Sequence, residues 1–340
     1  MKAIKLTVIF LIITAGAFAA WAVWTMRHYA ETPGSEIDRQ VIFAIAPGEG
    51  FNQMTARLQS RGVITSPFKF KLLARFKGDD KKLKAGEYHL SASMSPSQVL
   101  DVLVNGKIYL YRLTIPEGFN AHQIADEIAA QGLGDAHAFL ALVMDPETAR
   151  QFGIEAKSLE GYLFPDTYYF PRGVSALTIA RKMVERFKEQ FKPAWIQRAH
   201  ELHLTVHQIV TLASIIEKET GDPAERPLIS SVFHNRLKKK MRLESDPTVI
   251  YGIKDFDGNL TRRHLNTPTP YNTYTIRGLP PGPIASPGTA SIEAALYPAH
   301  TDYLFFVSKK DNTHQFSVTI EEHNRAVRKY QLRRHRKAKS

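Results

Sequence analysis

An uncharged N-terminal segment constrains this chain more than any other feature of its sequence. Residues 6–24 are nineteen consecutive residues without a charged side chain, and a helix of this length spans the ~30 Å hydrocarbon core of a bilayer. A cleaved signal peptide is the alternative, because residues 17–19 (AFA) resemble a cleavage site. An apolar stretch longer than ~15 residues favours a retained helix, so the sequence predicts a single membrane anchor within residues 1–28.

The charges that flank this segment predict its orientation. Lys2 and Lys5 precede it, whereas acidic residues follow it from Glu31 onward. Basic residues beside a membrane helix favour the cytoplasmic side. The sequence therefore predicts a single-pass protein of the inner membrane whose residues 30–340 lie in the periplasm.

The chain as a whole is basic. Its 340 residues carry a formal net charge of +12, which indicates an acidic partner such as nucleic acid, anionic lipid or a carboxylate-bearing polymer. The predicted location argues against nucleic acid, and neither a Walker-type motif nor an RNA-binding aromatic signature occurs. Part of the excess charge lies at residues 331–340, which are expected to form a basic, solvated tail.

Several classes of site are excluded by what the sequence lacks. There is no cysteine, so neither disulfide bonds nor a cysteine-ligated zinc site can form. No H-E-x-x-H motif and no G-x-S-x-G motif occurs, which argues against a metalloprotease site and against a serine nucleophile. We therefore expect no metal ion and no cofactor.

A polar linker at residues 29–39 is predicted to lead into a small α+β domain at residues 40–108. The expected elements, in chain order, are a strand at 41–45, helices from about Asn52 and over 67–76, a strand at 86–90 and a helix from Ser95 or Pro96 to Gly106. The order strand, helix, helix, strand is LysM-like in outline. A small α+β domain without a ligand fits the same pattern.

A weak internal repeat marks the start of a larger domain. The segment IAPGEGFN at residues 45–52 is echoed by TIPEGFN at residues 114–120, and each copy precedes an amphipathic helix. Two copies are too few for a solenoid. We expect the second copy to open a mixed α+β domain over residues 109–330, so that the chain as a whole is α+β.

The most informative helix is predicted at residues 207–220 (HQIVTLASIIEKET). At 100° per residue, Glu217 shares a face with Val210 and Ala213, and Ser214 lies just to one side. A carboxyl group among apolar side chains favours its neutral form, because charge is poorly solvated there. This is the form that a general acid needs.

A structural explanation of Glu217 fits the helix equally well. A buried glutamate can pair with an arginine, and Arg226 and Arg242 follow in the sequence. Glu219 projects about 200° away from Glu217 around the helix. It is therefore expected to be dispensable for any chemistry at Glu217.

Two later segments have the composition of a sugar-binding cleft. Residues 244–252 (ESDPTVIYG) place Asp246 before a proline, and residues 270–288 (PYNTYTIRGLPPGPIASPG) combine tyrosines with many prolines and glycines. Aromatic rings stack on sugar faces, while amides and hydroxyls bind sugar hydroxyls. The alternative is a structural turn with packing tyrosines.

A third segment contains two more acids. Residues 159–170 (LEGYLFPDTYYF) include Glu160 and Asp166, and either could be the second carboxylate of a hydrolase. The alternation of side chains and the proline favour an edge strand instead.

Together these features closely resemble the MltG-type (YceG-like) endolytic murein transglycosylases. The resemblance rests on the anchor, the LysM-like outline and the segments LEGYLFPDTYYF, ASIIEKET, ESDPTVIYG and YNTYTIRGLPPGPIASPG, in that order. It covers nearly the whole chain. It implies a lyase that cleaves the β-1,4 bond between N-acetylmuramic acid and N-acetylglucosamine in nascent peptidoglycan strands and leaves 1,6-anhydro ends.

The resemblance also implies roles for single residues. The catalytic glutamate of the family maps onto Glu217, which is expected to act first as general acid and then as general base. Residues on the segments that line the family's cleft, together with the serine beside Glu217, are expected to bind substrate: Ser214, Asp246, Tyr271, Asn272 and Tyr274.

The expected partners are peptidoglycan glycan strands and the membrane, and the resemblance adds peptidoglycan synthases or division proteins. Two alternatives remain open. In a hydrolytic muramidase, water would attack in place of the muramyl 6-hydroxyl. In a membrane-tethered scaffold, the cleft would bind peptidoglycan without cleaving it, although a glutamate on an apolar helix face argues against this.

Overall fold

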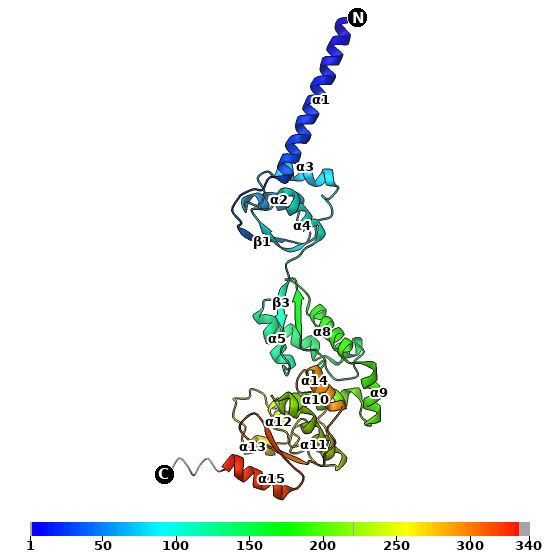
Figure 1. Cartoon of the computed structure of the whole chain (residues 1–340), viewed down its shortest axis with the longest axis vertical. Helices are drawn as coiled ribbons and strands as arrows, with labels where there is room; N and C mark the ends of the chain where they lie inside the picture. The colour runs from blue at the N-terminus through cyan, green and yellow to red at the C-terminus, as the bar shows by residue number, and fades with distance from the viewer. Residues whose placement is uncertain (1, 220, 333–340) are drawn as a thin grey trace, which may run out of the picture. The chain divides into compact units, whose positions relative to one another are not determined.

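The computed structural model describes residues 2–219 and 221–332. The chain divides into two compact units, Met1–Tyr111 and Arg112–Ser340 (Figure 1). Each unit combines helices with short strands, which confirms the mixed α+β class. Apart from its first two residues, the predicted basic tail lies outside the described residues.

The first unit begins with helix α1 (Lys2–Glu31), whose apolar segment is not covered by the rest of the protein. Its length and composition suit a membrane span. The helix continues beyond the predicted anchor because Tyr29 is buried in the core of the unit, where its hydroxyl donates a hydrogen bond of 2.9 Å to the carbonyl of Ser66. The first residues of the predicted linker are therefore helical.

The remaining elements of the first unit follow the predicted order. They are β1 (Gln40–Ile45), α2 (Phe51–Ser60), α3 (Pro67–Lys77), β2 (Gly86–Ser91) and α4 (Pro96–Asn105). Strands β1 and β2 pair antiparallel, with Gln40 opposite Ser91. Helix α4 begins with a capping box between Ser95 and Gln98 and ends at Gly106, whose φ of 64° suits glycine.

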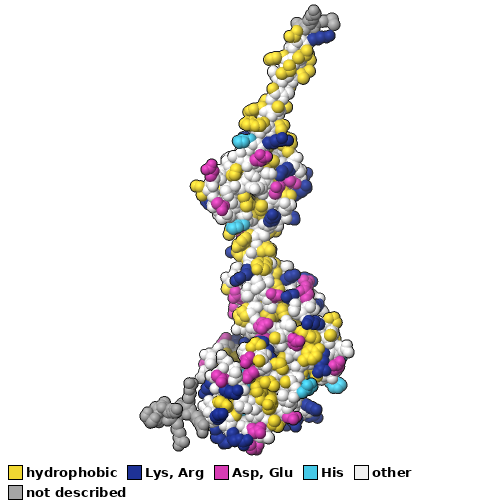
Figure 2. Space-filling model, in the orientation of Figure 1, with side chains coloured by type: hydrophobic (Ala, Val, Ile, Leu, Met, Phe, Trp, Pro, Cys, Tyr) yellow, Lys and Arg dark blue, Asp and Glu magenta, His cyan; other side chains and the backbone are white. Residues whose placement is uncertain are grey.

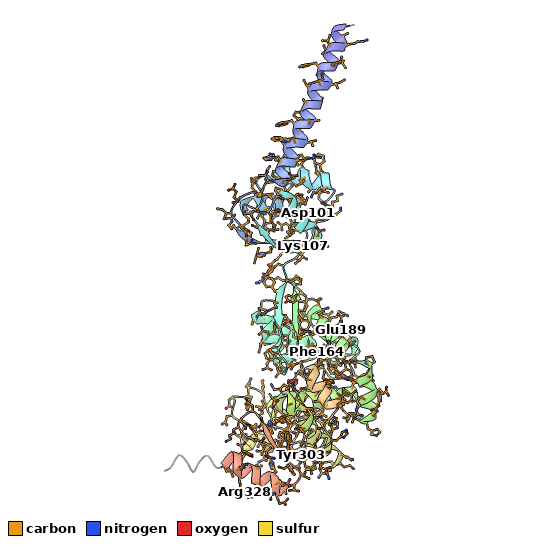
Figure 3. The ribbon with its side chains drawn as sticks, in the orientation of Figure 1. Asp101, Lys107, Phe164, Glu189, Tyr303 and Arg328 are labelled. Atoms are coloured by element: carbon orange, nitrogen blue, oxygen red, sulfur yellow. The ribbon has the colours of Figure 1, made fainter. Side chains whose placement is uncertain are left out.

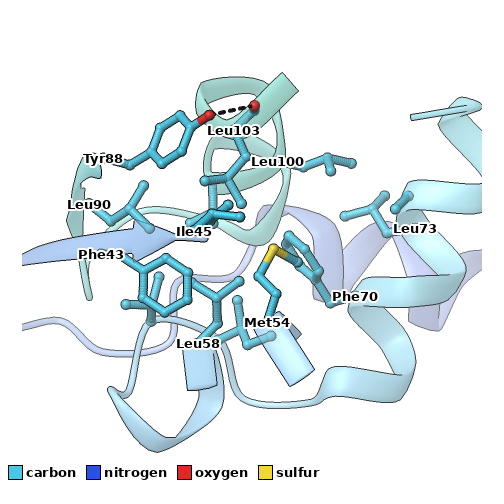
Figure 4. Packing of buried hydrophobic residues seen from close by; sticks show 14 of the residues in the cluster. Phe43, Ile45, Met54, Leu58, Phe70, Leu73, Tyr88, Leu90, Leu100 and Leu103 are labelled. Atoms are coloured by element: carbon cyan, nitrogen blue, oxygen red, sulfur yellow. Dashed lines mark hydrogen bonds between the residues drawn. The ribbon is translucent and has the colours of Figure 1, made fainter. Parts of the chain in front are cut away.

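The core of the first unit lies between the two strands and the helices (Figure 4). Phe43 and Leu90 contribute from the strands, and Leu58 and Leu100 contribute from α2 and α4. Tyr88 is fully buried, and its hydroxyl donates a hydrogen bond of 2.6 Å to the carbonyl of Lys84. The buried ring is thus accommodated without an unpaired polar group.

The second unit contains two small sheets. Strand β3 (Tyr111–Thr114), which begins at the boundary of the units, is hydrogen-bonded to β4 (Thr167–Phe170). Strand β5 (Phe305–Ser308) pairs antiparallel with β6 (His314–Ser317). The α-helices of this unit are α5 (Ala121–Ala130), α6 (Ala136–Val143), α7 (Pro146–Gln151), α8 (Ala176–Gln190), α9 (Pro193–Glu201), α10 (Val206–Glu219), α11 (Arg226–Lys238), α12 (Asp246–Tyr251), α13 (Arg262–Asn266), α14 (Thr289–Leu296) and α15 (Ile320–Val327).

Two predictions for this unit differ from the structure. Only the last four residues of the segment at 159–170 form a strand, because the apolar residues 161–164 are all buried and so cannot alternate between two faces. Helix α10, packed against α14, α11 and α12, is buried on every side from residue 209 to residue 216 rather than along one stripe. The run of fully buried residues ends just before Glu217, where the candidate site begins.

Candidate active site

Glu217 lies in the last turn of α10, at the point where the helix leaves the core. Its side chain is only 6% exposed. One carboxylate oxygen accepts a hydrogen bond of 2.9 Å from the backbone N–H of Gly288, and the other accepts one of 3.3 Å from Nη2 of Arg226. Of the two surroundings that the sequence left open, the structure therefore shows the buried ion pair, and the partner is Arg226.

A second carboxyl group, which the sequence did not single out, lies beside this ion pair. Glu117 comes from the segment between β3 and α5, and its Oε2 is 3.9 Å from Nη2 of Arg226. Burial, and then the negative charge of Glu217, raise the pKa of Glu117, while Arg226 opposes the shift. A Cβ atom on Gly288 would clash with the carboxyl group of Glu117, so the glycine leaves room for this group.

The internal repeat was the sequence signal for Glu117. The corresponding residue of the first copy is Glu49, which pairs with Arg57 at 2.7 Å within its own unit. In the second copy the corresponding glutamate, Glu117, lies against Arg226 of helix α11 instead. The glutamate of the repeated turn thus has a different arginine partner in each copy, and only the second copy lies at the candidate site.

The loop before α14 is held against the same turn by backbone hydrogen bonds. The N–H of Gly118 donates to the carbonyl of Ser286 at 2.9 Å, and the N–H of Ser286 donates to the carbonyl of Phe119 at 2.7 Å. The hydroxyl of Ser214 accepts from the N–H of Ile284 at 3.0 Å. Ser214 has no exposed surface, so in this structure it positions the loop and is not available to a ligand.

Glu219 lies on another side of α10 and is partly buried. The hydroxyl of Ser245 donates a hydrogen bond to its carboxylate, and burial raises the pKa of Glu219 to about 7. Close by, the exposed Asp246 accepts a hydrogen bond of 2.7 Å from the hydroxyl of Tyr274. Two of the predicted substrate-binding residues are therefore paired with each other at the surface.

The other two predicted binding residues have different surroundings. Asn272 is fully buried, and its amide donates to three backbone carbonyls, the closest being that of Thr267 at 2.7 Å. It therefore fixes the loop. Tyr271 is partly buried against Tyr251, with ring centroids 4.7 Å apart, and retains some exposed surface.

The two acids of the segment at 159–170 have structural partners. Glu160 is buried, accepts hydrogen bonds from the N–H of Ala121 and from the hydroxyl of Tyr251, and has its pKa raised to about 7 by burial. Asp166 accepts a hydrogen bond of 2.7 Å from Arg186. The acid found beside Glu217 is thus Glu117 and neither of these two.

A polar hollow reaches the same end of α10. It has a volume of about 710 Å³, and Glu219, Asp311, Asn312, Thr313 and His314 are among the residues that line it. Asn, Thr and His side chains suit the hydroxyl groups of a sugar.

Across residues 2–219 and 221–332, no cluster of three His, Asp or Glu side chains has the arrangement of a metal site.

Comparison with known proteins shows to which family this sequence belongs. Residues 43–329 match the YceG-like family. The chain belongs to that family. The resemblance found in the sequence is thereby confirmed, and it extends through both units.

Two relatives of this YceG-like chain share one name. The chain is 35% identical over 301 residues to the endolytic murein transglycosylase of Bacillus subtilis strain 168, and the alignment covers 84% of this chain and 83% of the relative. It is 30% identical over 322 residues to the endolytic murein transglycosylase of Streptococcus pneumoniae serotype 2, covering 85% of this chain but 58% of that relative. A crystal structure of a yceG-like protein from Listeria monocytogenes, 35% identical, superposes with a TM-score of 0.59 over 85% of this chain and 100% of the other.

Proposed function

We propose that this protein is an endolytic murein transglycosylase, a lyase that cuts peptidoglycan strands internally between N-acetylmuramic acid and N-acetylglucosamine. The relatives that carry this name match over most of the chain. The observation that carries the proposal is the carboxyl group of Glu217, which is nearly buried at the end of α10 yet held by a backbone N–H and by Arg226. One acid in such a position can give a proton and take one back.

In the proposed reaction, protonated Glu217 donates its proton to the glycosidic oxygen as the bond to C1 of the muramyl residue breaks. The 6-hydroxyl of that residue then attacks C1, and the carboxylate of Glu217 takes the hydroxyl proton. The product is a 1,6-anhydro end, and no water is consumed. Because the attacking hydroxyl belongs to the substrate, its proximity replaces a positioned water molecule.

The neighbours of Glu217 suit both steps. The N–H of Gly288 and the guanidinium of Arg226 stabilise the carboxylate that forms after the first transfer. Glu117 places a second carboxyl group beside the same arginine, and burial and the charge of Glu217 raise the pKa of Glu117. Nε of Arg226 is buried without a hydrogen-bond partner among the described atoms.

Substrate binding is proposed for the predicted residues that have exposed surface. Asp246, Tyr274 and Tyr271 would contact the glycan, whereas Ser214 and Asn272 position the loops that carry the site. The first unit has the order β-strand, helix, helix, β-strand of the LysM-like prediction. It would hold the glycan near the membrane. Synthases or division proteins are the proposed protein partners.

Helix α1 is proposed to be a single-pass anchor of the inner membrane, with residues 30–340 in the periplasm. Its uncovered apolar segment and the lysines before it support this orientation. A reporter enzyme fused after residue 340 that is active only in the cytoplasm would reject it.

A hydrolytic muramidase is the second candidate, and Glu117 is the observation that favours it, because hydrolysis commonly uses two carboxyl groups. Mass spectrometry of the fragments released by the purified protein separates the two reactions, since the anhydro product is lighter than the hydrolytic product by one water. Reducing muramic acid ends would favour the muramidase. Intact strands that remain bound would favour a non-catalytic scaffold.

A further inference from the structure

Helix α3 has an apolar surface that the fold of the first unit leaves uncovered. Phe70 and its neighbours on one side of the helix face the core. On the opposite side, Phe68 and Phe76 are 74% and 75% exposed. Leu72 lies between them at helical spacing, so Phe68, Leu72 and Phe76 form what we call the outward face of α3.

Basic side chains border the outward face. By helical geometry Lys71 and Arg75 lie along one edge and Lys69 along the other. No acidic residue within residues 2–219 and 221–332 forms an ion pair with any of the three. Figure 2 shows Lys and Arg side chains, with some Asp and Glu, among apolar ones on the first unit next to the foot of α1. The outward face is therefore apolar at its centre and positively charged at its edges.

The N-terminal end of α3 is held close to the end of the apolar segment of α1. Ser66 is the N-cap of α3, and its carbonyl accepts the hydrogen bond from buried Tyr29. Tyr29 follows Trp24, the last residue of the apolar segment, by five residues, which is about 7.5 Å along a helix. The headgroup layer beside the hydrocarbon core is roughly 5–7 Å thick. When α1 spans a membrane, the start of α3 thus lies at the depth of the lipid headgroups.

We propose that α3 binds the surface of the membrane that α1 spans. The outward face enters the boundary between headgroups and acyl chains, and Lys71 and Arg75 contact the phosphates of anionic phospholipids. A lipid surface is the occupant that fits this face, because the face lies at headgroup depth and the charged residues along its edges, Lys69, Lys71 and Arg75, are all basic. The proposal rests on α1 being the proposed anchor and is independent of the catalytic activity.

Spin labels on single cysteines test this in the full-length chain, which has no cysteine of its own. The variants Phe68→Cys and Phe76→Cys are labelled and reconstituted into vesicles that contain phosphatidylglycerol. Ile42→Cys is the control, because Ile42 is an apolar side chain, 50% exposed, on strand β1 of the same unit. Ala19→Cys, within the apolar segment, reports separately whether α1 is in the bilayer.

We expect the labels at positions 68 and 76 to collide more often with oxygen, which is enriched in lipid, and less often with a water-soluble nickel chelate than the label at position 42. Labels at 68 and 76 that are as accessible to nickel as the control, while the label at 19 is protected, would overturn the proposal. Spin–spin broadening that disappears on dilution with unlabelled protein would overturn it in favour of a contact between copies. An exposed label at 19 would reject the anchor itself.

Charge reversal tests the role of the bases. Arg75→Glu is expected to shift the label at position 68 toward water and to remove the difference between phosphatidylglycerol vesicles and neutral ones. Lys107→Glu is the matched control, because it makes the same change in net charge at an exposed residue on the side of the first unit away from the foot of α1 (Figure 3). Equal effects of the two substitutions would show that net charge alone matters and would contradict a specific contact through α3.

Discussion

Arg226 lies between two carboxyl groups at the end of helix α10. Its Nη2 is 3.3 Å from Glu217 and 3.9 Å from Glu117. Glu217 is largely shielded from water, and Lys218 donates a hydrogen bond of 3.2 Å to the carbonyl of Gly118 beside the pair. Burial and the negative charge of Glu217 raise the pKa of Glu117, so the two carboxyl groups at this arginine influence each other.

Replacing Glu217 with glutamine is expected to remove nearly all glycan cleavage and to keep the fold. The amide oxygen can still accept from Gly288, whereas the proton donor and acceptor are lost. General acid–base assistance contributes roughly 10²–10⁴-fold, and one residue performs both steps here, so the loss should reach the upper end. Mass spectrometry of released fragments and circular dichroism check the two halves of this prediction.

The matched control for this change is Glu189→Gln on helix α8 (Figure 3). Glu189 is an exposed glutamate whose partner is also an arginine, Arg186 at 3.2 Å. It should cleave like the unmodified protein. Cleavage at the normal rate by folded Glu217→Gln would contradict the proposed mechanism.

Replacing Glu117 with glutamine is expected to change the pH dependence of cleavage. Burial and the negative charge of Glu217 raise the pKa of Glu117, so the charge beside Arg226 changes above the pH at which an ordinary glutamate ionises. The glutamine variant lacks this ionisation, and the corresponding step should be absent from its profile. A pH profile of the initial rate measures this, and a uniform loss at every pH would instead indicate that Glu117 only binds substrate.

Stability is also expected to depend on pH through Glu160. Its pKa is raised from 4.5 to about 7 in the folded protein, so its contribution to stability is fully present below about pH 4.5 and is lost as the pH rises toward 7. A shift of this size corresponds to about 3 kcal/mol. Thermal unfolding should therefore show a lower melting temperature at pH 8 than at pH 5, and Glu160→Gln should reduce the difference. If the melting temperatures of Glu160→Gln at pH 5 and pH 8 differ as much as those of the unmodified protein, the pH dependence comes from other groups, such as Glu219.

At the scale of helices and strands, local sequence signals predicted where elements end, whereas contacts between residues far apart in the sequence were missed. The capping residues Ser95 and Gly106 fixed the ends of α4, because caps depend only on neighbouring residues. The ion pair partner of Glu217 remained undecided, since Arg226 meets it only after the chain turns back beyond α10. Glu117 was missed because it reaches the site through hydrogen bonds between Gly118 and Ser286, two segments far apart in the sequence.

The loop before α14 gives a test at this scale. Alanine at position 288 has an acceptable backbone conformation, because φ is −74°, but its Cβ would displace the carboxyl group of Glu117. Gly288→Ala is therefore expected to reproduce the effect of Glu117→Gln on the pH profile with little change in melting temperature. Gly134→Ala, where the nearest atom is an ordinary contact at 3.5 Å, is the control. Additive effects of Gly288→Ala and Glu117→Gln in one chain would show that the two act separately.

At the scale of the whole molecule, the anchor and the first unit are joined without a free linker. The sequence indicated a polar connection from residue 29, because Pro33 and Gly34 follow closely. The structure places Tyr29 in the core and packs Met26 and Ala30 against it. A pattern of residue types could not predict this, since a single aromatic at the end of an apolar helix fits a membrane interface equally well.

The position of a truncation should therefore decide whether the protein without its anchor is stable. A chain that begins at residue 26 retains Tyr29, whereas a chain that begins at residue 32 loses a buried ring, a change that typically costs about 3–5 kcal/mol for large aromatic residues. The longer chain is expected to melt at the higher temperature and to resist proteolysis of its first unit. Tyr29→Phe in the longer chain removes only the bond to Ser66 and should fall between the two, with a loss of about 1 kcal/mol. Equal melting of all three chains would mean that the end of α1 contributes nothing to the core, and the distance argument that places α3 at the lipid headgroups would then lose its basis.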